Sequence, residues 1–273
     1  MLFKTKGLCK SIFAEALKTQ GCDDMKVKEI LDFLYKIAPK ELAQDFDNVG
    51  LLVGDKEAEI TGVMVTLDCF EEVVDRAEDL GANLIITHHP IIFSPLKSVT
   101  AESVVYKLIA KGVSVISMHT NLDQADGGVN DALCNALGLY DVEPITCGDG
   151  FVIRKGYLDM PEDPYSFARH IKEALGGTVK FVAGTSDVAC VAVCSGSGAD
   201  FLSDAIAAGA DALVTADVKH HMFIEAGRCG ISLYDAGHFN TEDVIVSSLC
   251  RDISGAFPEL IVSECHFSKI ENV

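Results

Sequence analysis

Two adjacent histidines, His88 and His89, end an apolar stretch that has the pattern of a buried strand, NLIITHHP. Successive strand residues face opposite sides, so one ring could lie in the core and the other on the surface. This alternation lapses where a strand ends, and Pro90 favours an extended conformation for His89. Both imidazoles can then face one site, and imidazole is a common metal ligand.

Three further polar clusters also follow predicted strands. They are HTNLD, with His119 and Asp123; TADVKHH, with Asp217, His220 and His221; and GHFNTE, with His238 and Glu242. Six of the eight histidines of the chain fall in these loops, an order that scattered core or surface histidines would not usually show. Because function collects at the carboxyl ends of parallel strands, these clusters are candidates for one site.

Each cluster also has a purely structural interpretation. Asp123 could cap a turn, which is a frequent role of aspartate. GHFNTE resembles a helix start, with Asn240 or Thr241 as the N-cap and Glu242 in the first turn. His238 and Glu242 are nevertheless four residues apart, so both can also converge on one ion.

Taken together, the clusters favour a metal site with three imidazoles and two carboxylates. The predicted ligands are His88, His89, Asp123, His238 and Glu242. This set suits two divalent ions of zinc, manganese or iron and does not choose among them. A bridging carboxylate would hold two ions about 3.5–4 Å apart and activate a water. His119 and the His220–His221 pair would then orient ligands or shuttle protons.

A glycine-rich loop, CSGSGAD, follows the strand that ends at Cys194. Its amides precede a predicted helix and could hold a phosphate. A tight turn without any ligand explains the same residues, so both interpretations, a phosphate site and a plain turn, remain open.

The elements that position these clusters alternate between strands and helices, which predicts parallel βαβ units. Residues 1–24 are expected to be an extension, and a helix with apolar residues at helical spacing follows Met25. GANLIIT at Gly81 matches GADALVT at Gly209, and GVSVISMHTNLD at Gly112 matches GISLYDAGHFNTE at Gly230. We therefore expect an internally duplicated α/β fold with mainly parallel sheets facing a central cleft. The predicted halves are residues 25–145 and 146–273, joined through residues 141–150.

Composition limits the possible partners. A formal net charge of −19 makes nucleic-acid binding unlikely over most of the surface. The ten cysteines form no CxxC pair, which is typical of reduced residues in a cytoplasmic protein. No apolar run reaches the roughly 18 residues of a membrane span, and the N-terminus lacks the apolar region of a secretion signal.

Five motifs, DFDNVGLLVGD, NLIITHHPIIF, SMHTNLDQADGGVND, GADALVTADVKHH and DAGHFNTE, resemble those of the NIF-three-like family, whose members carry the name GTP cyclohydrolase 1 type 2 homologue. The resemblance covers the chain from about Met25. It implies a duplicated α/β fold, a homohexameric ring and a dinuclear metal site with the five ligands given above. The short connection between the halves implies the compact form, without an inserted domain.

The resemblance also implies a reaction, the hydrolytic opening of the guanine ring of GTP. An activated water would attack the carbon between two ring nitrogens, and His119 or His221 would protonate the leaving nitrogen. Two functions therefore remain open from the sequence: a metal-dependent hydrolase acting on a nucleotide or related small molecule, and a non-catalytic metal-binding, scaffold or regulatory protein.

Overall fold

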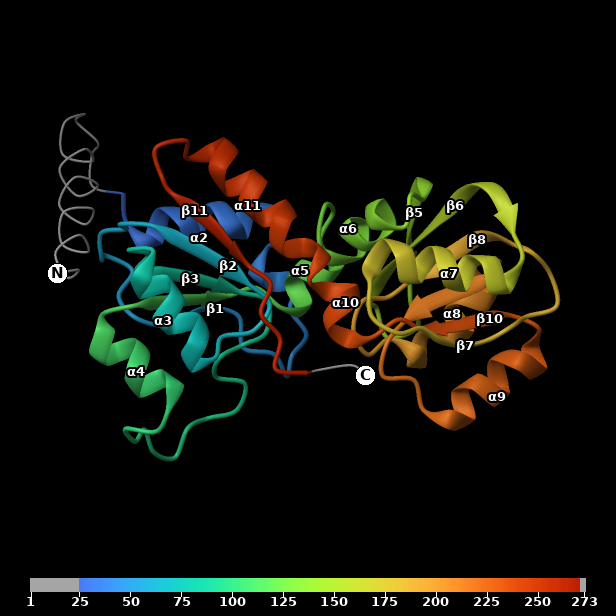
Figure 1. Ribbon diagram of the computed structural model, residues 1–273, viewed down its shortest axis with the longest axis horizontal. Helices are drawn as coiled ribbons and strands as arrows, with labels where there is room; N and C mark the ends of the chain where they lie inside the picture. The colour runs from blue at the N-terminus through green and yellow to red at the C-terminus, as the bar shows by residue number, and fades with distance from the viewer. Residues whose placement is uncertain (1–24, 271–273) are drawn as a thin grey trace, which may run out of the picture.

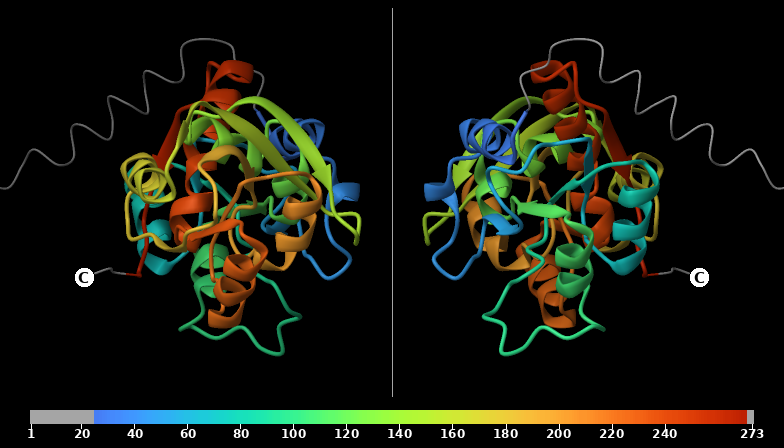
Figure 2. Two further views of the ribbon diagram at one scale, coloured as in Figure 1. Left: turned by 90° about the vertical axis from the view of Figure 1, so that its right-hand side faces the viewer. Right: turned by 90° about the vertical axis from the view of Figure 1, so that its left-hand side faces the viewer.

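The computed structural model describes residues 25–270, and the predicted extension, residues 1–24, lies outside this part of the chain. Two β-sheets occupy opposite ends of the long axis, and the short helices α5 (Thr120–Gln124) and α10 (His238–Glu242) lie between them (Figure 1). Viewed along the long axis, helices lie on several sides of the strands (Figure 2). The predicted α/β class is confirmed.

The first sheet has the strand order β1-β4-β3-β2-β11. Neighbouring strands are parallel except that β1 runs antiparallel to β4. The strands are β1 (Gly50–Val53), β2 (Val63–Thr66), β3 (Leu84–Thr87), β4 (Ser114–Ser117) and β11 (Val262–Cys265). Because β11 comes from the C-terminal end of the chain, this sheet is not confined to residues 25–145.

Helices cover both faces of the first sheet. Val63 and Val65 of β2 pack in one core with α2 and α11, whereas Met64 between them packs in another core with α3 and α4. Such strands are buried throughout, as expected for parallel strands joined by crossover helices. The helices are α2 (Val27–Ile37), α3 (Glu71–Asp79), α4 (Val104–Lys111) and α11 (Val244–Ala256), with a 3₁₀ turn η1 (Lys40–Leu42).

The second sheet has the order β5-β6-β8-β9-β10-β7. Its centre, β8-β9-β10, is parallel, and β5, β6 and β7 add antiparallel pairs on either side. The strands are β5 (Tyr140–Thr146), β6 (Val152–Glu162), β7 (Lys180–Val182), β8 (Val188–Val193), β9 (Ala212–Thr215) and β10 (Ser232–Asp235). The remaining helices are α6 (Val129–Ala136), α7 (Pro164–Leu175), the 3₁₀ turn η2 (Ala199–Phe201), α8 (Leu202–Ala207) and α9 (His220–Cys229).

The segment predicted to join the halves, residues 141–150, contains most of β5 instead of a plain loop. Pro144 is tolerated in this strand because β5 lies at the edge of the sheet, where a missing N–H breaks no inner ladder. The predicted boundary after residue 145 therefore falls inside a strand and does not divide the two sheets.

The two halves repeat one order of elements, strand–helix–strand–helix–strand–short helix. In the first sheet it runs β2-α3-β3-α4-β4-α5, and in the second β8-α8-β9-α9-β10-α10. The glycines paired by sequence share left-handed backbone angles, with φ 73° at Gly81 and 77° at Gly209, and 67° at Gly112 and 77° at Gly230. This agreement is what an internal duplication predicts.

Candidate metal centre

The paired histidines lie just beyond β3, where the chain continues the strand pairing for two more residues. The amides of His88 and His89 donate to the carbonyl groups of Thr66 and Leu67, at 3.3 and 3.1 Å. Both rings nevertheless belong to one cluster, with ring centroids 5.2 Å apart. The expected lapse of strand alternation therefore occurs at this point.

The structure brings all five predicted ligands together between the two sheets. Their nitrogen and oxygen atoms form overlapping groups that could hold a metal ion, with the ligand atoms of each group within 4.8 Å of one another. One group contains His88, Asp123 and Glu242, and a second contains His89, His238 and Glu242. The first half supplies His88, His89 and Asp123, and α10 supplies the other two.

Glu242 belongs to both groups and turns a different oxygen to each. Its Oε2 lies 2.9 Å from His89 Nε2 and 3.0 Å from His238 Nε2. Its Oε1 lies 3.8 Å from His88 Nε2, which is also 3.5 Å from Asp123 Oδ1. A carboxylate with one oxygen toward each group has the geometry of a bridging ligand.

The outward nitrogens of the imidazoles all face hydrogen-bond acceptors. His88 Nδ1 lies 2.9 Å from the carbonyl oxygen of Met118. The Nδ1 atoms of three other rings each face a carboxylate: His89 faces Asp68 at 2.8 Å, His119 faces Asp47 at 2.9 Å, and His238 faces Asp217 at 2.7 Å. These acceptors hold a proton on Nδ1, so each ring, once it is neutral, presents the lone pair of Nε2 to the cluster.

Two side-chain atoms that point into the cluster lack a hydrogen-bond partner in a suitable direction. His88 Nε2 and Glu242 Oε2 are buried and make no hydrogen bond of acceptable geometry within residues 25–270, although Oε2 has two nitrogens at about 3 Å. Leaving buried polar atoms unpaired is costly, so their convergence calls for a further positive group. Imidazole and carboxylate are suitable ligands for a divalent first-row ion, so the residues fit the predicted metal.

The electrostatics of the cluster also favour a cation. Burial lowers the pKa of His89, but the contacts with Asp68 and Glu242 outweigh burial and raise the pKa to about 10. The contact with Glu242 raises the pKa of His238 to about 9, against burial. Burial by itself would raise the pKa of Glu242, yet the imidazoles hold it well below its usual value. Protons on the imidazoles thus occupy the place that a metal ion would take.

The acceptors Asp47 and Asp68 were not predicted as site residues. Asp68 lies two residues beyond the end of β2, as His89 lies two residues beyond the end of β3, and Asp47 lies in the motif DFDNVG. Their positions in the sequence could therefore have pointed to both. Hydrogen bonds from His119 and Thr120 outweigh the burial of Asp47 and lower its pKa to about 2. Asp217, which was grouped with His220 and His221, has a positive φ of 53°, a strained conformation for a residue other than glycine.

The two histidines predicted to be catalytic differ in position. His119 joins His88 and His89 in a third group that could hold a metal ion, and its ring centroid lies 5.2 Å from that of His88. His221 lies at the exposed start of α9, and no hydrogen bond or ion pair among the described residues connects it to the cluster. The residue of the TADVKHH motif that does contact the cluster is Asp217, through His238.

The glycine-rich loop after β8 packs against the cluster. The amides of Ser195, Gly196 and Gly198 donate to side chains of the protein, namely Asn130, Thr241 and Thr215. These three amides are therefore already paired, which favours the tight-turn interpretation of the loop over a phosphate site. A Cβ on Gly196 would lie 2.1 Å from Glu242 Oε1, so this glycine allows the backbone to approach the carboxylate of Glu242.

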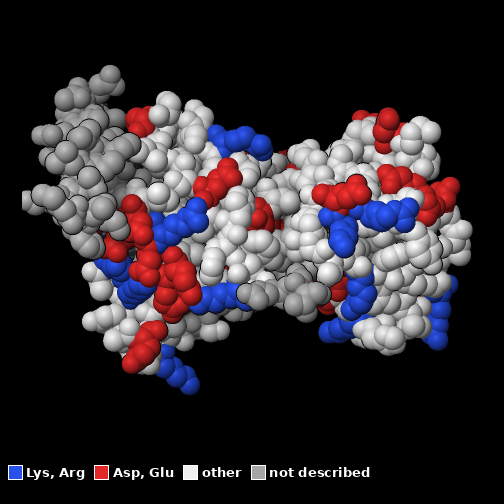
Figure 3. Space-filling model, viewed as in Figure 1, with Lys and Arg blue, Asp and Glu red and all other residues white. Residues whose placement is uncertain are grey.

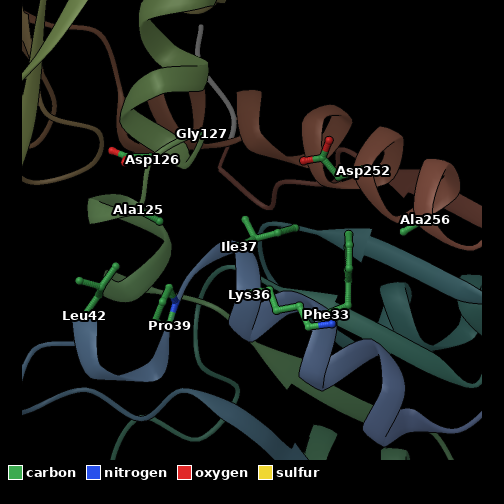
Figure 4. A pocket seen from close by; sticks show the side chains of 10 residues that line it. All are labelled: Phe33, Lys36, Ile37, Pro39, Leu42, Ala125, Asp126, Gly127, Asp252 and Ala256. Carbon is green, nitrogen blue, oxygen red and sulfur yellow. The ribbon is translucent and has the colours of Figure 1, made fainter.

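A surface groove lies elsewhere, between α2, α11 and the connection between α5 and α6 (Figure 4). It has a volume of about 680 Å³, and none of its lining residues is a cluster residue.

Lysine, arginine and acidic side chains are interspersed on the face shown in Figure 3, without a continuous basic surface there. No helix within residues 25–270 combines the length and apolar character that crossing a membrane requires.

The fold and the cluster define a two-sheet α/β protein with a histidine–carboxylate centre between duplicated halves. The family model of Duf34/NIF3 (NGG1p interacting factor 3) matches residues 25–273, and the chain belongs to this family. The match begins where the predicted extension ends.

Relatives and solved structures agree with this assignment. A Clostridium perfringens protein named GTP cyclohydrolase 1 type 2 homolog is 36% identical over 256 residues, which cover 88% of this chain and 97% of that protein. The crystal structure of Staphylococcus aureus hypothetical protein SA1388 aligns with a TM-score of 0.85 at 28% identity, over 92% of this chain and all of that chain. Reduced HcgD from Methanocaldococcus jannaschii aligns with a TM-score of 0.76 at 29% identity, over 89% and 98%.

Proposed function

We propose that the protein holds two divalent metal ions in the cluster and uses them to hydrolyse a nucleotide. The observation that carries the proposal is the arrangement of His88, His89 and His238, whose Nδ1 atoms face outward acceptors while their Nε2 atoms face the carboxylates of Asp123 and Glu242. One position would use His88 and Asp123, the other His89 and His238. Glu242 would serve both, with one oxygen toward each.

A bound pair of divalent ions would supply positive charge and a reactive water near neutral pH. The residues of the chain would do the remaining work. Asp68 and Asp217 hold the rings of His89 and His238 in place. Asp47, whose pKa is lowered to about 2, accepts a hydrogen bond from His119 Nδ1 and so fixes the orientation of this ring. His119 is thus placed to donate a proton from Nε2 to a leaving nitrogen.

Two exposed aromatic rings support a flat substrate. Phe93 is 51% exposed, and its ring centroid lies 6.3 Å from that of His119. Phe46 is 66% exposed and lies 6.3 Å from Phe93. Such rings beside the cluster offer a surface for stacking a nucleobase. The names of the relatives, GTP cyclohydrolase 1 type 2 homolog, make GTP the first substrate to test.

The test combines metal content and turnover. We expect elemental analysis of the purified protein to find two ions per chain, and the loaded protein to release formate from GTP or a related nucleotide. His119→Gln should retain both ions and lose about 10²–10⁴-fold in turnover, the usual contribution of a general acid. Loss of an ion in that variant would make His119 a ligand, and intact turnover would remove it from the reaction.

The alternative is a non-catalytic metal protein, and the division of ligands between the two halves favours it as the second candidate. Ions held by His88 of one half and Glu242 of the other would fasten the sheets together. In that case His88→Ala should lower the melting temperature by many degrees, and no nucleotide should be turned over by the loaded protein.

Assembly and location complete the proposal. We propose a homohexamer, on the family resemblance, and light scattering of the purified protein measures its mass. The eight cysteines within residues 25–270 are all free, which supports a cytoplasmic location.

A further inference from the structure

Asp123 stands just before a tight turn, residues 124–128, that joins α5 to α6. A Cβ on Gly128 would lie 1.9 Å from the carbonyl oxygen of Leu122, so the turn is packed closely against its own helix. Figure 4 shows Ala125, Asp126 and Gly127 of this turn beside the groove. The turn is therefore packed directly against the helix that carries Asp123.

A buried arginine of the second sheet holds this turn. Arg154 in β6 is 2% exposed, and its Nη2 donates to the carbonyl groups of Gln124 and Ala125, at 3.3 and 3.1 Å. Its Nε donates to both carboxylate oxygens of Asp131, at 3.1 and 3.2 Å. Asp131 in turn accepts from the amide of Gly127 at 2.8 Å. One guanidinium thus fixes both ends of the turn.

A second contact ties Asp123 to the loop after β8. Asn130 is fully buried; its Nδ2 donates to the carbonyl oxygen of Asp123 at 3.0 Å, and its Oδ1 accepts from the amide of Ser195 at 2.8 Å. The hydroxyl of Ser195 donates to Asp123 Oδ1 at 3.3 Å. The second half therefore holds the carboxylate of Asp123 directly, through Ser195, and its backbone indirectly, through Asn130.

We propose that Arg154 is a positioning residue for Asp123, so that a strand of the second sheet controls the metal position facing His88. This inference rests on the proposed function, because it requires a metal at Asp123. The rings of His89 and His238 are held by Asp68 and Asp217 instead, and no hydrogen bond or ion pair within residues 25–270 joins any of these four to Arg154. Loss of Arg154 should thus affect one of the two positions.

The experiment is a Zn²⁺ titration of the full chain by calorimetry. Arg154→Lys keeps the charge but loses the planar fork that reaches two carbonyls and a carboxylate together. We expect wild-type protein to bind two ions and the variant to bind one with unchanged affinity and the other about 10–100-fold more weakly, as for loss of an outer partner. In an Asp123→Ala background, Arg154→Lys should cause no further loss, because both changes act on the same position.

The matched control is Lys155→Ala, the next residue of β6, which pairs with Glu143 at 3.4 Å and leaves the turn untouched. It should bind both ions as wild type does. Equal weakening of both positions in Arg154→Lys, or weakening of neither, would overturn the proposal. Additive loss in the Asp123→Ala background would overturn it as well.

If Arg154→Lys does not fold, Ser195→Ala tests the same control of Asp123 by the second half with the loss of a single hydroxyl. It should selectively weaken the same position, by a smaller factor, and an unchanged titration would count against the proposal. The titration of the wild-type protein distinguishes a failure of the dinuclear site from a failure of the role of Arg154. Fewer than two ions in wild type refutes the dinuclear site itself, whereas two ions with an unaffected Arg154→Lys variant refutes only the role of Arg154.

Discussion

The two halves of the molecule share a scaffold and differ in what they place at the ends of corresponding strands. After β3 the first half continues with His88 and His89, whereas after β9 the second half has Ala216 and Asp217 at the matching positions. Asp217 therefore stands where the first half has His89. One half supplies an imidazole at this point, and the other supplies a carboxylate that holds the imidazole of His238.

A second difference lies at the ends of β2 and β8. Asp68 of the first half corresponds to Gly196 of the second, by the same spacing that pairs Gly81 with Gly209. Asp68 holds His89, while Gly196 leaves room for Glu242. The two halves thus share their backbone positions, as an internal duplication predicts. Their side chains differ: at corresponding positions one half has a candidate metal ligand or its supporting carboxylate, and the other has a residue of a different type.

The largest effect is expected from Glu242→Gln, because this residue serves both halves. We expect binding at both metal positions to weaken by more than about 100-fold, beyond the loss typical of an outer partner. Zn²⁺ titration with circular dichroism as a folding check measures this. If one ion still binds tightly, Glu242 does not bridge, and the two positions are independent.

A matched pair of variants, Asp68→Asn and Asp217→Asn, compares the supporting carboxylates of the two halves. Each should weaken Zn²⁺ binding about 10–100-fold, because the ring it holds loses its orientation and basicity. Asp75→Asn, at an exposed carboxylate on α3, is the control and should have no effect. A large loss in Asp68→Asn together with none in Asp217→Asn would show that the second half does not use its carboxylate in this way.

Metal binding should strengthen as pH rises. In the metal-free protein the pKa values of His89 and His238 are raised to about 10 and about 9, so both rings carry a proton on Nε2 at pH 7. A metal must displace these protons, so the apparent affinity should rise about tenfold per pH unit for each proton displaced, and fall on acidification. Calorimetry in buffers of different ionisation enthalpy counts the protons released. A pH-independent affinity between pH 6 and 8 would contradict the displacement.

The smallest effect is expected at the exposed start of α9. His221→Ala should leave metal content and turnover unchanged, because the described residues give His221 no contact with the cluster. Turnover of the nucleotide and elemental analysis check this. A clear loss of turnover with metal retained would restore the catalytic role predicted from the sequence, and would require α9 to approach the site.

The sequence by itself determined the fold class, the repeat and the five candidate ligands. These follow from local chemistry: strand and helix periods, glycines at left-handed positions, and histidines at strand ends. The resemblance of five motifs also identified the family. The division predicted after residue 145 falls inside β5, because a polar segment of this kind becomes a strand only through its pairing with β6.

Only the tertiary structure decided which neighbours complete the site. Asp47 lies 72 residues from His119, and Arg154 lies 31 residues from Asp123, so no local pattern joins them. The structure also gave the glycine loop its role as a spacer for Glu242 and separated His221 from the cluster. Hydrogen bonds between distant segments depend on how the sheets pack, and that packing is a property of the whole chain.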